Sequence, residues 1–512
     1  MVKTVDFSGK PFHFIGIGGI GMSALAYILA KRQLPVSGSD LRSSHITERL
    51  QAVGAHIFNS QEATNLELFQ TVGAVPPCSS STIPSYPLPA LAGAAVRNGS
   101  RSPSHSWTQK PEKANLPQVI CSTAISASNS EYLAALEGGC PIFHRSDVLA
   151  ALIADYHSIA VAGTHGKTTT SSLLGYVLLD AGLDPTIIVG GEVEAWEGNA
   201  RLGQGDYLVA EADESDGSLT KHSPAIGIVT NIELDHPDHY QDLEAVVEIF
   251  KVFESQCGVL VGCLDCQAVR SYLQPQITYS LDPTSEADYT AQQIICHAGG
   301  SSAEVWERGE YLGKLHLRLP GKHNLSNALA VVATCRHLGL DFATIAAGIA
   351  TFGGAKRRFE QRGECQGITF IDDYAHHPSE IRATLAAARS KIGHQEKARV
   401  VAIFQPHRYS RTATFLDEFA TAFGDADLVV TTDIYSAGEK NLHGLEGQHV
   451  AQAISRHHQE VYFHPDLKSL RHRLRELLQP GDMALFLGAG NLNQEIPGTI
   501  ALYAAQIEDL NA

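Results

Sequence analysis

Residues 161–170 read VAGTHGKTTT, at the end of the apolar run SIAVA and just before SSLLGYVLL, which has helical periodicity. A glycine-rich turn between a strand and a helix binds phosphate, because N–H groups at the helix N-terminus point at the phosphate oxygens. Lys167 would neutralise the terminal phosphates, and the Thr168 hydroxyl would hold Mg²⁺. The general spacing requires glycine at position 161, where this chain has Val161, so the compact turn favours a small set of ATP-dependent ligases. The turn residues expected to bind ATP are Gly163, Thr164, His165, Gly166, Lys167, Thr168 and Thr169.

The size and composition of the chain predict a folded, multidomain protein. Its 512 residues suggest about three domains, and 44% hydrophobic with 18% charged residues is typical of a globular chain. No apolar stretch approaches the ~20 residues that span a bilayer, and the N-terminus lacks the features of a signal peptide. We therefore expect a soluble, cytoplasmic protein with no membrane insertion.

The charge and the cysteines exclude some classes of function. A net charge of −17 argues against nucleic acid as a partner, although local Lys, Arg and Mg²⁺ can still bind anionic substrates. The nine cysteines are scattered and are expected to be reduced. Cys263 and Cys266 form a lone C-x-x-C, for which zinc or redox chemistry is a weaker alternative.

Three segments each begin a strand–turn–helix pattern, near residues 11, 158 and 367, and strand-like runs alternate with helical runs after each. This alternation predicts α/β domains with mainly parallel sheets. We expect three domains, at residues 1–156, 157–353 and 354–512. Residues 275–320 lack helical periodicity and suggest a β-hairpin insertion in the middle domain, and the Pro- and Ser-rich stretch at 76–117 is expected to be a mobile surface loop.

Gly16, Gly18 and Gly21 follow an apolar strand and open a helix, and Asp40 ends the next strand. This pattern fits the G-x-G-x-x-G dinucleotide fingerprint. A tight turn at a helix N-terminus binds any phosphate, however, and Asp40 can bind any ribose hydroxyl. NAD and a UDP-linked substrate both remain open on this evidence.

Acidic and histidine residues after two further strands are candidate metal ligands. In EADESD (residues 211–216), Glu211 is the best candidate for Mg²⁺, with Asp213 as the alternative. In NIELDHPDH (residues 231–239), His236 and His239 have spacing that could suit zinc, but no third soft ligand follows. Histidine is also an uncommon Mg²⁺ ligand.

The last third of the chain carries a basic run and two polar motifs. Arg358, in AKRRFE (residues 355–360), could reach an ATP phosphate from a hinge. DDYAHHPSE (372–380) and PHRYSRT (406–412) each follow a strand. Arg408 and Arg411 lie three apart, so a helical turn would place both guanidinium groups on one face, where they suit a carboxylate or a phosphate.

Together these segments resemble the Mur ligase family over essentially the whole chain except residues 76–117. The resemblance is carried by GIGGIGMSALA, GTHGKTTT, EADESDGS, the NIE-x-DH run, RRFE, DDYAHHP and QPHRYSRT. His165 and the DYAHHP run favour the alanine-adding branch, because other Mur ligases usually carry Asn at the position of His165. The resemblance implies an N-terminal Rossmann-like domain for a UDP-sugar, a central P-loop ATPase domain and a C-terminal Rossmann-like domain for an amino acid.

By matching position, the resemblance also implies roles for single residues. Thr168, Glu211 and His236 would surround Mg²⁺, and Lys167 would contact the ATP phosphates, with His323 and Asn327 near adenine. Tyr374, His376, Arg408 and Arg411 would line the amino-acid and acyl-phosphate site. Gly18, Gly19, Asp40, Ser122 and Thr123 would hold the UDP-muramate.

The implied reaction is ATP-dependent ligation of L-alanine to the lactyl carboxylate of UDP-N-acetylmuramate, through an acyl phosphate, in peptidoglycan precursor synthesis. ATP is then a co-substrate, and Lys167, His376, Arg408 and Arg411 would carry the chemistry. The same chemistry with another amino acid or a recycled peptide is a close alternative. A nucleotide-gated redox protein with NAD on the first glycine loop is a more distant one. The expected assembly is a monomer or homodimer.

Overall fold

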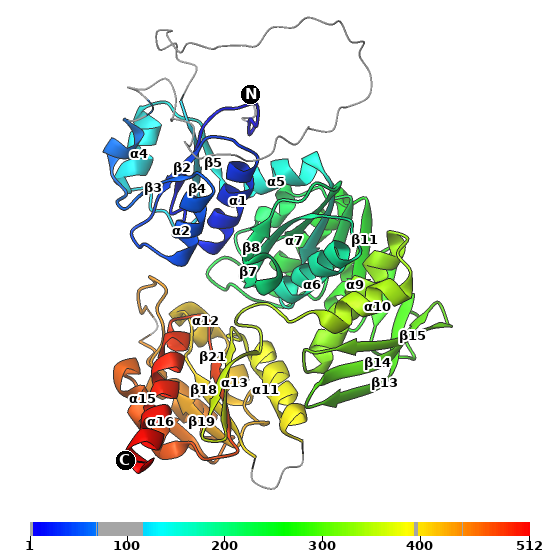
Figure 1. The fold of residues 1–512 in the computed structure, drawn as a ribbon, viewed down its shortest axis with the longest axis vertical. Helices are drawn as coiled ribbons and strands as arrows, with labels where there is room; N and C mark the ends of the chain where they lie inside the picture. Colours follow the sequence, from blue (N-terminus) through cyan, green and yellow to red (C-terminus); the bar gives the residue numbers. More distant parts are fainter. Residues whose placement is uncertain (1–3, 68, 70–115, 394–397, 443, 512) are drawn as a thin grey trace, which may run out of the picture. The chain divides into compact units, whose positions relative to one another are not determined.

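The computed structural model describes residues 4–67, 69, 116–393, 398–442 and 444–511. Most of the stretch expected to be a mobile loop, residues 76–115, lies outside this description. The chain divides into two compact units, Met1–Val148 and Leu149–Ala512, and each is described by itself. Their strands form three separate sheets (Figure 1).

The first unit contains a five-stranded sheet in the order β3-β2-β1-β4-β5, with every pairing parallel. Because the strand order changes direction between β1 and β4, the loops that follow these two strands flank a switch point, the usual place for a ligand. Its elements are β1 (Phe12–Ile15), α1 (Ile20–Lys31), β2 (Val36–Ser39), α2 (His45–Ala52), β3 (His56–Phe58), η1 (Ala63–Leu66), β4 (Gln118–Cys121), α4 (Ser130–Glu137), β5 (Ile142–His144) and α5 (Arg145–Asp155), which crosses into the second unit.

The second unit begins with a ten-stranded sheet in the order β15-β14-β13-β12-β11-β10-β6-β9-β7-β8. Its strands are β6 (His157–Ala162), β7 (Thr186–Val193), β8 (Gly198–Arg201), β9 (Tyr207–Glu211), β10 (Ile226–Val229), β11 (Val259–Cys263), β12 (Ile277–Ser280), β13 (Tyr289–His297), β14 (Gly300–Glu307) and β15 (Glu310–Leu317). Its helices are α6 (Lys167–Asp180), η3 (Glu194–Trp196), η4 (Ser218–Lys221), α7 (Leu243–Gln256), α8 (Gln267–Tyr272), α9 (Lys322–His337) and α10 (Phe342–Thr351).

The middle of this sheet is parallel and buried. β10 is buried along its whole length, and β6 along all but its first residue, as expected for parallel strands covered on both faces. The stretch at 275–320 forms β12 and an antiparallel meander of β13, β14 and β15, which extends the sheet and contacts α10 (Figure 1). It is therefore part of the main sheet.

The third sheet has the order β16-β17-β21-β18-β19-β20, in which only β16 and β17 pair antiparallel. Its strands are β16 (Glu360–Cys365), β17 (Ile368–Asp373), β18 (Val400–Phe404), β19 (Leu428–Thr431), β20 (Val461–Phe463) and β21 (Met483–Leu487). Its helices are α11 (Pro378–Ile392), α12 (Tyr409–Thr414), α13 (Leu416–Ala420), α14 (Gly447–Ile454), α15 (Leu467–Leu477), η5 (Leu492–Gln494) and α16 (Glu495–Asn511). Separate apolar clusters cover its two faces.

The predicted fold class, a three-domain α/β architecture with mainly parallel sheets, is confirmed. Within the described part of the chain, no helix is both long enough and apolar enough to cross a bilayer. The eight cysteines in that part are all free thiols.

Candidate functional site

The phosphate loop connects β6 to α6, as the sequence predicted, and its backbone requires glycine twice. Gly163 has φ +133° and Gly166 has φ +82°, both in the left-handed region. A Cβ at Gly163 would lie 2.0 Å from Thr230 Oγ1, and one at Gly166 would lie 2.6 Å from Asn327 Oδ1. Gly166 is also the N-cap of α6, so the loop presents this helix N-terminus to a ligand.

Lys167 is held in place by the loop and by a carboxylate that the sequence analysis did not single out. Its Nζ donates to the carbonyl oxygen of Gly163 at 2.6 Å and to both carboxylate oxygens of Glu214, at 2.7 and 2.9 Å. Burial raises the pKa of Glu214 to about 7, with Lys167 opposing the shift. The ammonium group is therefore fixed beside the turn before any phosphate arrives.

Thr168, Glu211 and Arg358 meet behind the turn. Thr168 Oγ1 donates to Glu211 Oε1 at 3.1 Å and accepts from the Arg358 guanidinium at 3.2 Å. The other oxygen of Glu211 accepts from the backbone N–H of Gly190 at 2.6 Å. A hydroxyl beside a carboxylate is the oxygen donor set that Mg²⁺ prefers, so these two residues fit a magnesium site.

His236 lies in the loop after β10 with a positive φ of 55°. Its Nε2 is 3.6 Å from the carboxylate of Asp235. Burial lowers the pKa of His236, against the attraction of Asp235, so its ring is neutral and could act as a ligand. No contact joins it to Thr168 or Glu211 in the described structure, and its predicted place in the metal site stays a prediction.

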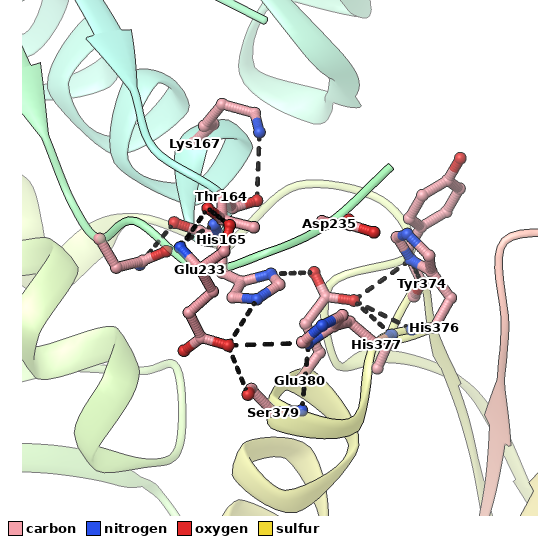
Figure 2. Close-up of polar contacts among 12 residues, drawn as sticks. Thr164, His165, Lys167, Glu233, Asp235, Tyr374, His376, His377, Ser379 and Glu380 are labelled. Atoms are coloured by element: carbon pink, nitrogen blue, oxygen red, sulfur yellow. Dashed lines mark hydrogen bonds and ion pairs between the residues drawn. The ribbon is translucent and has the colours of Figure 1, made fainter. Parts of the chain in front are cut away.

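His165 lies between two carboxylates from different parts of the second unit (Figure 2). Its Nδ1 is 3.1 Å from Glu380 Oε1, on α11, and its Nε2 is 3.4 Å from Glu233 Oε2, in the loop after β10. Burial opposes the charged imidazolium, but Glu380 and Glu233 outweigh burial and raise the pKa of His165 to about 10. The ring is therefore a cation that links the phosphate loop to the third sheet's first helix.

Donor atoms of His165, Glu233 and His377 lie within 4.8 Å of one another, close enough for a divalent cation. However, an imidazolium has no free lone pair for a metal. Glu233 and Glu380 keep His165 protonated, so this cluster is better described as an ion pair between His165 and Glu233 than as a metal site. His377 lies beside it, with its ring 4.7 Å from that of His165 and its Nδ1 3.8 Å from Glu233.

His376 is the first of two neutral histidines in the DDYAHHPSE motif. Its Nδ1 is 2.9 Å from the carbonyl oxygen of Tyr374, to which it donates, leaving Nε2 as the basic nitrogen. Burial lowers the pKa of His376 to about 4, although Glu380 opposes the shift. At neutral pH this ring is therefore unprotonated, with the lone pair of Nε2 free. Tyr374 lies under Arg358, whose guanidinium is 5.1 Å from the ring centroid.

The two predicted arginines are not equivalent. Arg411, on α12, is only 2% exposed, and its Nε donates to Asp235 at 2.8 Å. Arg408 is the N-cap of that helix, about a third exposed, and it pairs with Asp238 at 2.5 Å. Both guanidinium groups therefore contact carboxylates of the loop after β10, and only Arg408 is open to solvent.

A cavity of about 710 Å³ lies beside the phosphate loop, lined from both the central and the third sheet's domains. His323 and Asn327, predicted to lie near adenine, line it together with Gly166 and Thr169. Burial lowers the pKa of His323 to about 4, so its ring is neutral. Asn324 donates to the carbonyl oxygen of Pro320, and Gly321 is the N-cap of α9. The other wall includes Arg358, Phe359, Asp373, Ser379, Glu380 and Thr384.

The predicted sugar-nucleotide residues lie at the switch point of the first unit. Asp40, after β2, accepts from the backbone N–H groups of Gly18, at 2.9 Å, and Arg42, at 3.0 Å. Gly19 is the N-cap of α1. Ser122 and Thr123 follow β4, the strand next to β1. Asp40 therefore holds the glycine loop by a hydrogen bond, and its predicted contact with a ribose stays a prediction.

The structure also identifies site residues that lie inside the sequence motifs but were not predicted individually. Glu214 lies in EADESD, Glu233 and Asp235 in NIELDH, and Glu380 in DDYAHHPSE. Each contacts a predicted residue: Lys167, His165 or Arg411. A carboxylate within a recognised motif was the available signal, but its partner lies far away in the chain.

Comparisons with known proteins agree with this arrangement. Family models match residues 11–157 (Mur ligase family, catalytic domain), 161–335 (Mur ligase middle domain) and 357–490 (Mur ligase, glutamate ligase domain). The chain is 68% identical over 509 residues to the UDP-N-acetylmuramate–L-alanine ligase of Crocosphaera subtropica, covering 98% of this chain and 96% of the relative. It is 67% identical over 501 residues to the enzyme of the same name from Gloeothece citriformis, covering 98% and 99%.

Solved structures give the same result. The crystal structure of UDP-N-acetylmuramate-alanine ligase from Thermotoga maritima matches with a TM-score of 0.74 and 28% identity, over 97% of this chain and 99% of that one. A murein peptide ligase from Psychrobacter arcticus shares the fold, with a TM-score of 0.66 and 21% identity over 96% and 99% of the two chains. With family models on all three sheets and relatives of this identity over nearly its full length, the chain belongs to the Mur ligase family.

Proposed function

We propose that this protein joins L-alanine to the lactyl carboxylate of UDP-N-acetylmuramate, with conversion of ATP to ADP and phosphate. The observation that carries the proposal is the full-length similarity to enzymes of that name. The phosphate loop, the neutral His376 and the arginines of the third domain lie in one unit, so they could act together on one carboxylate and one ATP. The product is a precursor of peptidoglycan.

The first step makes the carboxylate reactive. An oxygen of the lactyl carboxylate attacks the γ-phosphorus of ATP, the bond to the ADP oxygen breaks, and an acyl phosphate forms. Phosphoryl transfer depends on alignment and charge neutralisation. Lys167, which donates to the carbonyl oxygen of Gly163, would neutralise the phosphates, with Arg358 beside Thr168.

The second step forms the amide. The neutral amine of alanine attacks the acyl carbon, the tetrahedral intermediate collapses, and phosphate leaves as the amine loses a proton. His376 Nε2 is the candidate acceptor of that proton, because the ring is neutral and Nδ1 is engaged. Arg408, the more exposed arginine, would bind the alanine carboxylate, with Arg411 and Tyr374 beside it.

Mg²⁺ is proposed at Thr168 and Glu211, with His236 as the third predicted ligand. When bound there, the ion would neutralise charge on the transferring phosphate oxygens. Gly163, Thr164, His165, Gly166 and Thr169 would surround the phosphates, with His323 and Asn327 near adenine. Gly18, Gly19, Asp40, Ser122 and Thr123 would bind the UDP-muramate. A cytoplasmic location and a monomer or homodimer also stay predictions.

The test is phosphate release from ATP with UDP-N-acetylmuramate and each of L-Ala, Gly and L-Ser. We expect L-Ala to give the highest kcat/KM, although a pocket separates side chains by only ~1–3 kcal/mol per methylene. If L-Ala gives no phosphate release above background, the proposal is wrong. A titration with UDP-N-acetylmuramate and with NADH separates it from the redox alternative, which requires NADH to bind tightly.

A further inference from the structure

Glu380 contacts both halves of the candidate site. One of its oxygens, Oε1, is 3.1 Å from Nδ1 of His165 in the phosphate loop. The other, Oε2, accepts from the backbone N–H groups of His376, at 2.9 Å, and His377, at 3.2 Å, and lies 3.2 Å from His376 Nδ1 (Figure 2). A single carboxylate, 14% exposed, therefore connects the loop that would bind ATP with the histidine that would accept the amine's proton.

The other side of His165 is fixed within the central domain. Glu233 pairs with Nε2 of His165 at 3.4 Å and accepts from the hydroxyl of Ser379, at the start of α11, at 2.6 Å. The backbone N–H of Glu233 donates to Thr164 Oγ1 at 2.8 Å. His165 thus lies in a chain of contacts that begins in the phosphate loop and ends at the first turn of α11.

From these contacts we infer that Glu380 is a positioning residue: through His165 it holds the first turn of α11 against the phosphate loop, and so places His376 relative to the bound nucleotide. Glu380 need not touch a substrate to do this. The inference rests on the proposed function, and it assigns His165 an ion-pairing role in addition to its place in the loop.

This role follows from the geometry of the two carboxylate oxygens. The oxygen that faces the backbone N–H groups keeps the N-terminus of α11 capped, as Glu380 is the third residue of a capping box with His377. The oxygen that faces His165 adds nothing to that cap, so its use is the link to the loop. Replacing Glu380 by Gln keeps an acceptor for the cap and removes the charge that pairs with His165.

The test compares Glu380→Gln with Arg389→Gln in the full-length protein. Arg389 lies on the same helix and pairs with Asp427 inside the third domain, so its variant also loses one ion pair of α11. We expect Glu380→Gln to lower kcat about 10- to 100-fold, with the KM for UDP-N-acetylmuramate unchanged within twofold. Arg389→Gln should keep the wild-type kcat.

His165→Asn should lower kcat by a similar factor, and the double variant should be no slower than the slower single variant, because both changes break one link. Spectra of ¹⁵N-histidine-labelled protein give a readout that does not depend on turnover. The His165 resonance, assigned by its absence in His165→Asn, should keep its imidazolium shift from pH 7 to 9 in the wild type and titrate in that range in Glu380→Gln.

If the wild-type enzyme is active and Glu380→Gln and Arg389→Gln have equal kcat values, the inference is wrong. So would an unchanged His165 titration in Glu380→Gln. If the wild type itself shows no alanine-dependent turnover, the proposed function fails, while the histidine spectra still decide whether Glu380 controls the charge of His165.

Discussion

Residues of one type carry different charges in this structure because their surroundings differ. Three neighbouring histidines illustrate this: two carboxylates raise the pKa of His165 to about 10, whereas burial lowers the pKa of His376 and of His377 to about 4. One ring is therefore a cation at neutral pH and two are bases. The sequence places these residues in recognised motifs, but it does not contain the burial and the partners that determine their charge.

His376→Gln tests the assignment of the base. The amide can still donate a hydrogen bond but cannot accept a proton at neutral pH, so kcat should fall about 100-fold or more. ATP binding, measured by calorimetry with a non-hydrolysable analogue, should stay within threefold of the wild type. A kcat within threefold of the wild type would remove His376 from the mechanism.

Substitutions of the two arginines should have different effects: Arg411→Gln should mainly lower stability, and Arg408→Gln should mainly weaken alanine binding. Arg411→Gln leaves the buried Asp235 without its ion-pair partner and should lower the free energy of unfolding by about 3–5 kcal/mol. Arg408→Gln breaks a partly exposed pair and should cost about 1 kcal/mol or less, yet raise the KM for alanine. Urea unfolding and initial rates check both variants. Equal losses of stability would show that the buried ion pair contributes no more than the exposed one.

At the scale of elements, the parallel strands and the phosphate loop could be predicted because their signals are local. A buried run followed by Gly-x-x-Gly-Lys-Thr specifies a strand, a turn and a helix within about twenty residues. The contacts between the domains could not be predicted, because the residues that make them, such as His165 and Glu380, are 215 positions apart in the sequence. No periodicity in either segment identifies its partner, and the carboxylates that complete the site were recovered only from the fold.

The stability that the link between the phosphate loop and α11 provides should fall as the pH rises. A group whose pKa is raised on folding stabilises the fold fully below its unfolded pKa. The contribution of His165 is therefore present below about pH 6.5 and lost as the pH rises toward about 10. Urea unfolding between pH 6.5 and 10 should show a steeper loss of stability in the wild type than in His165→Asn.

An exposed histidine provides the control for this experiment. His457→Asn, on the surface of the third domain, should follow the wild-type pH dependence. Parallel curves for the wild type and His165→Asn would mean that the ring does not carry the charge assigned to it.

At the scale of the whole molecule, the chain consists of two compact units that would bind different substrates. A ligand stabilises the unit that binds it by an amount set by its concentration and Kd. Calorimetric unfolding should therefore show two transitions. UDP-N-acetylmuramate should raise one of them, and an ATP analogue with Mg²⁺ should raise the other.

Variants assign these transitions. Asp40→Ala should abolish the shift caused by the UDP-sugar alone, and Lys167→Met should abolish the shift caused by the nucleotide alone. A single transition that both ligands raise equally would contradict independent units.

The cavity beside the phosphate loop has a consequence for inhibitor design. Its walls come from two domains. Its lining includes Glu233 and Glu380, the two carboxylates that pair with His165, and Ser379, whose hydroxyl donates to Glu233. A compound that fills its ~710 Å³ and replaces a partner of His165 would have to neutralise an imidazolium. An acidic group at that point would form this ion pair in place of Glu233 or Glu380.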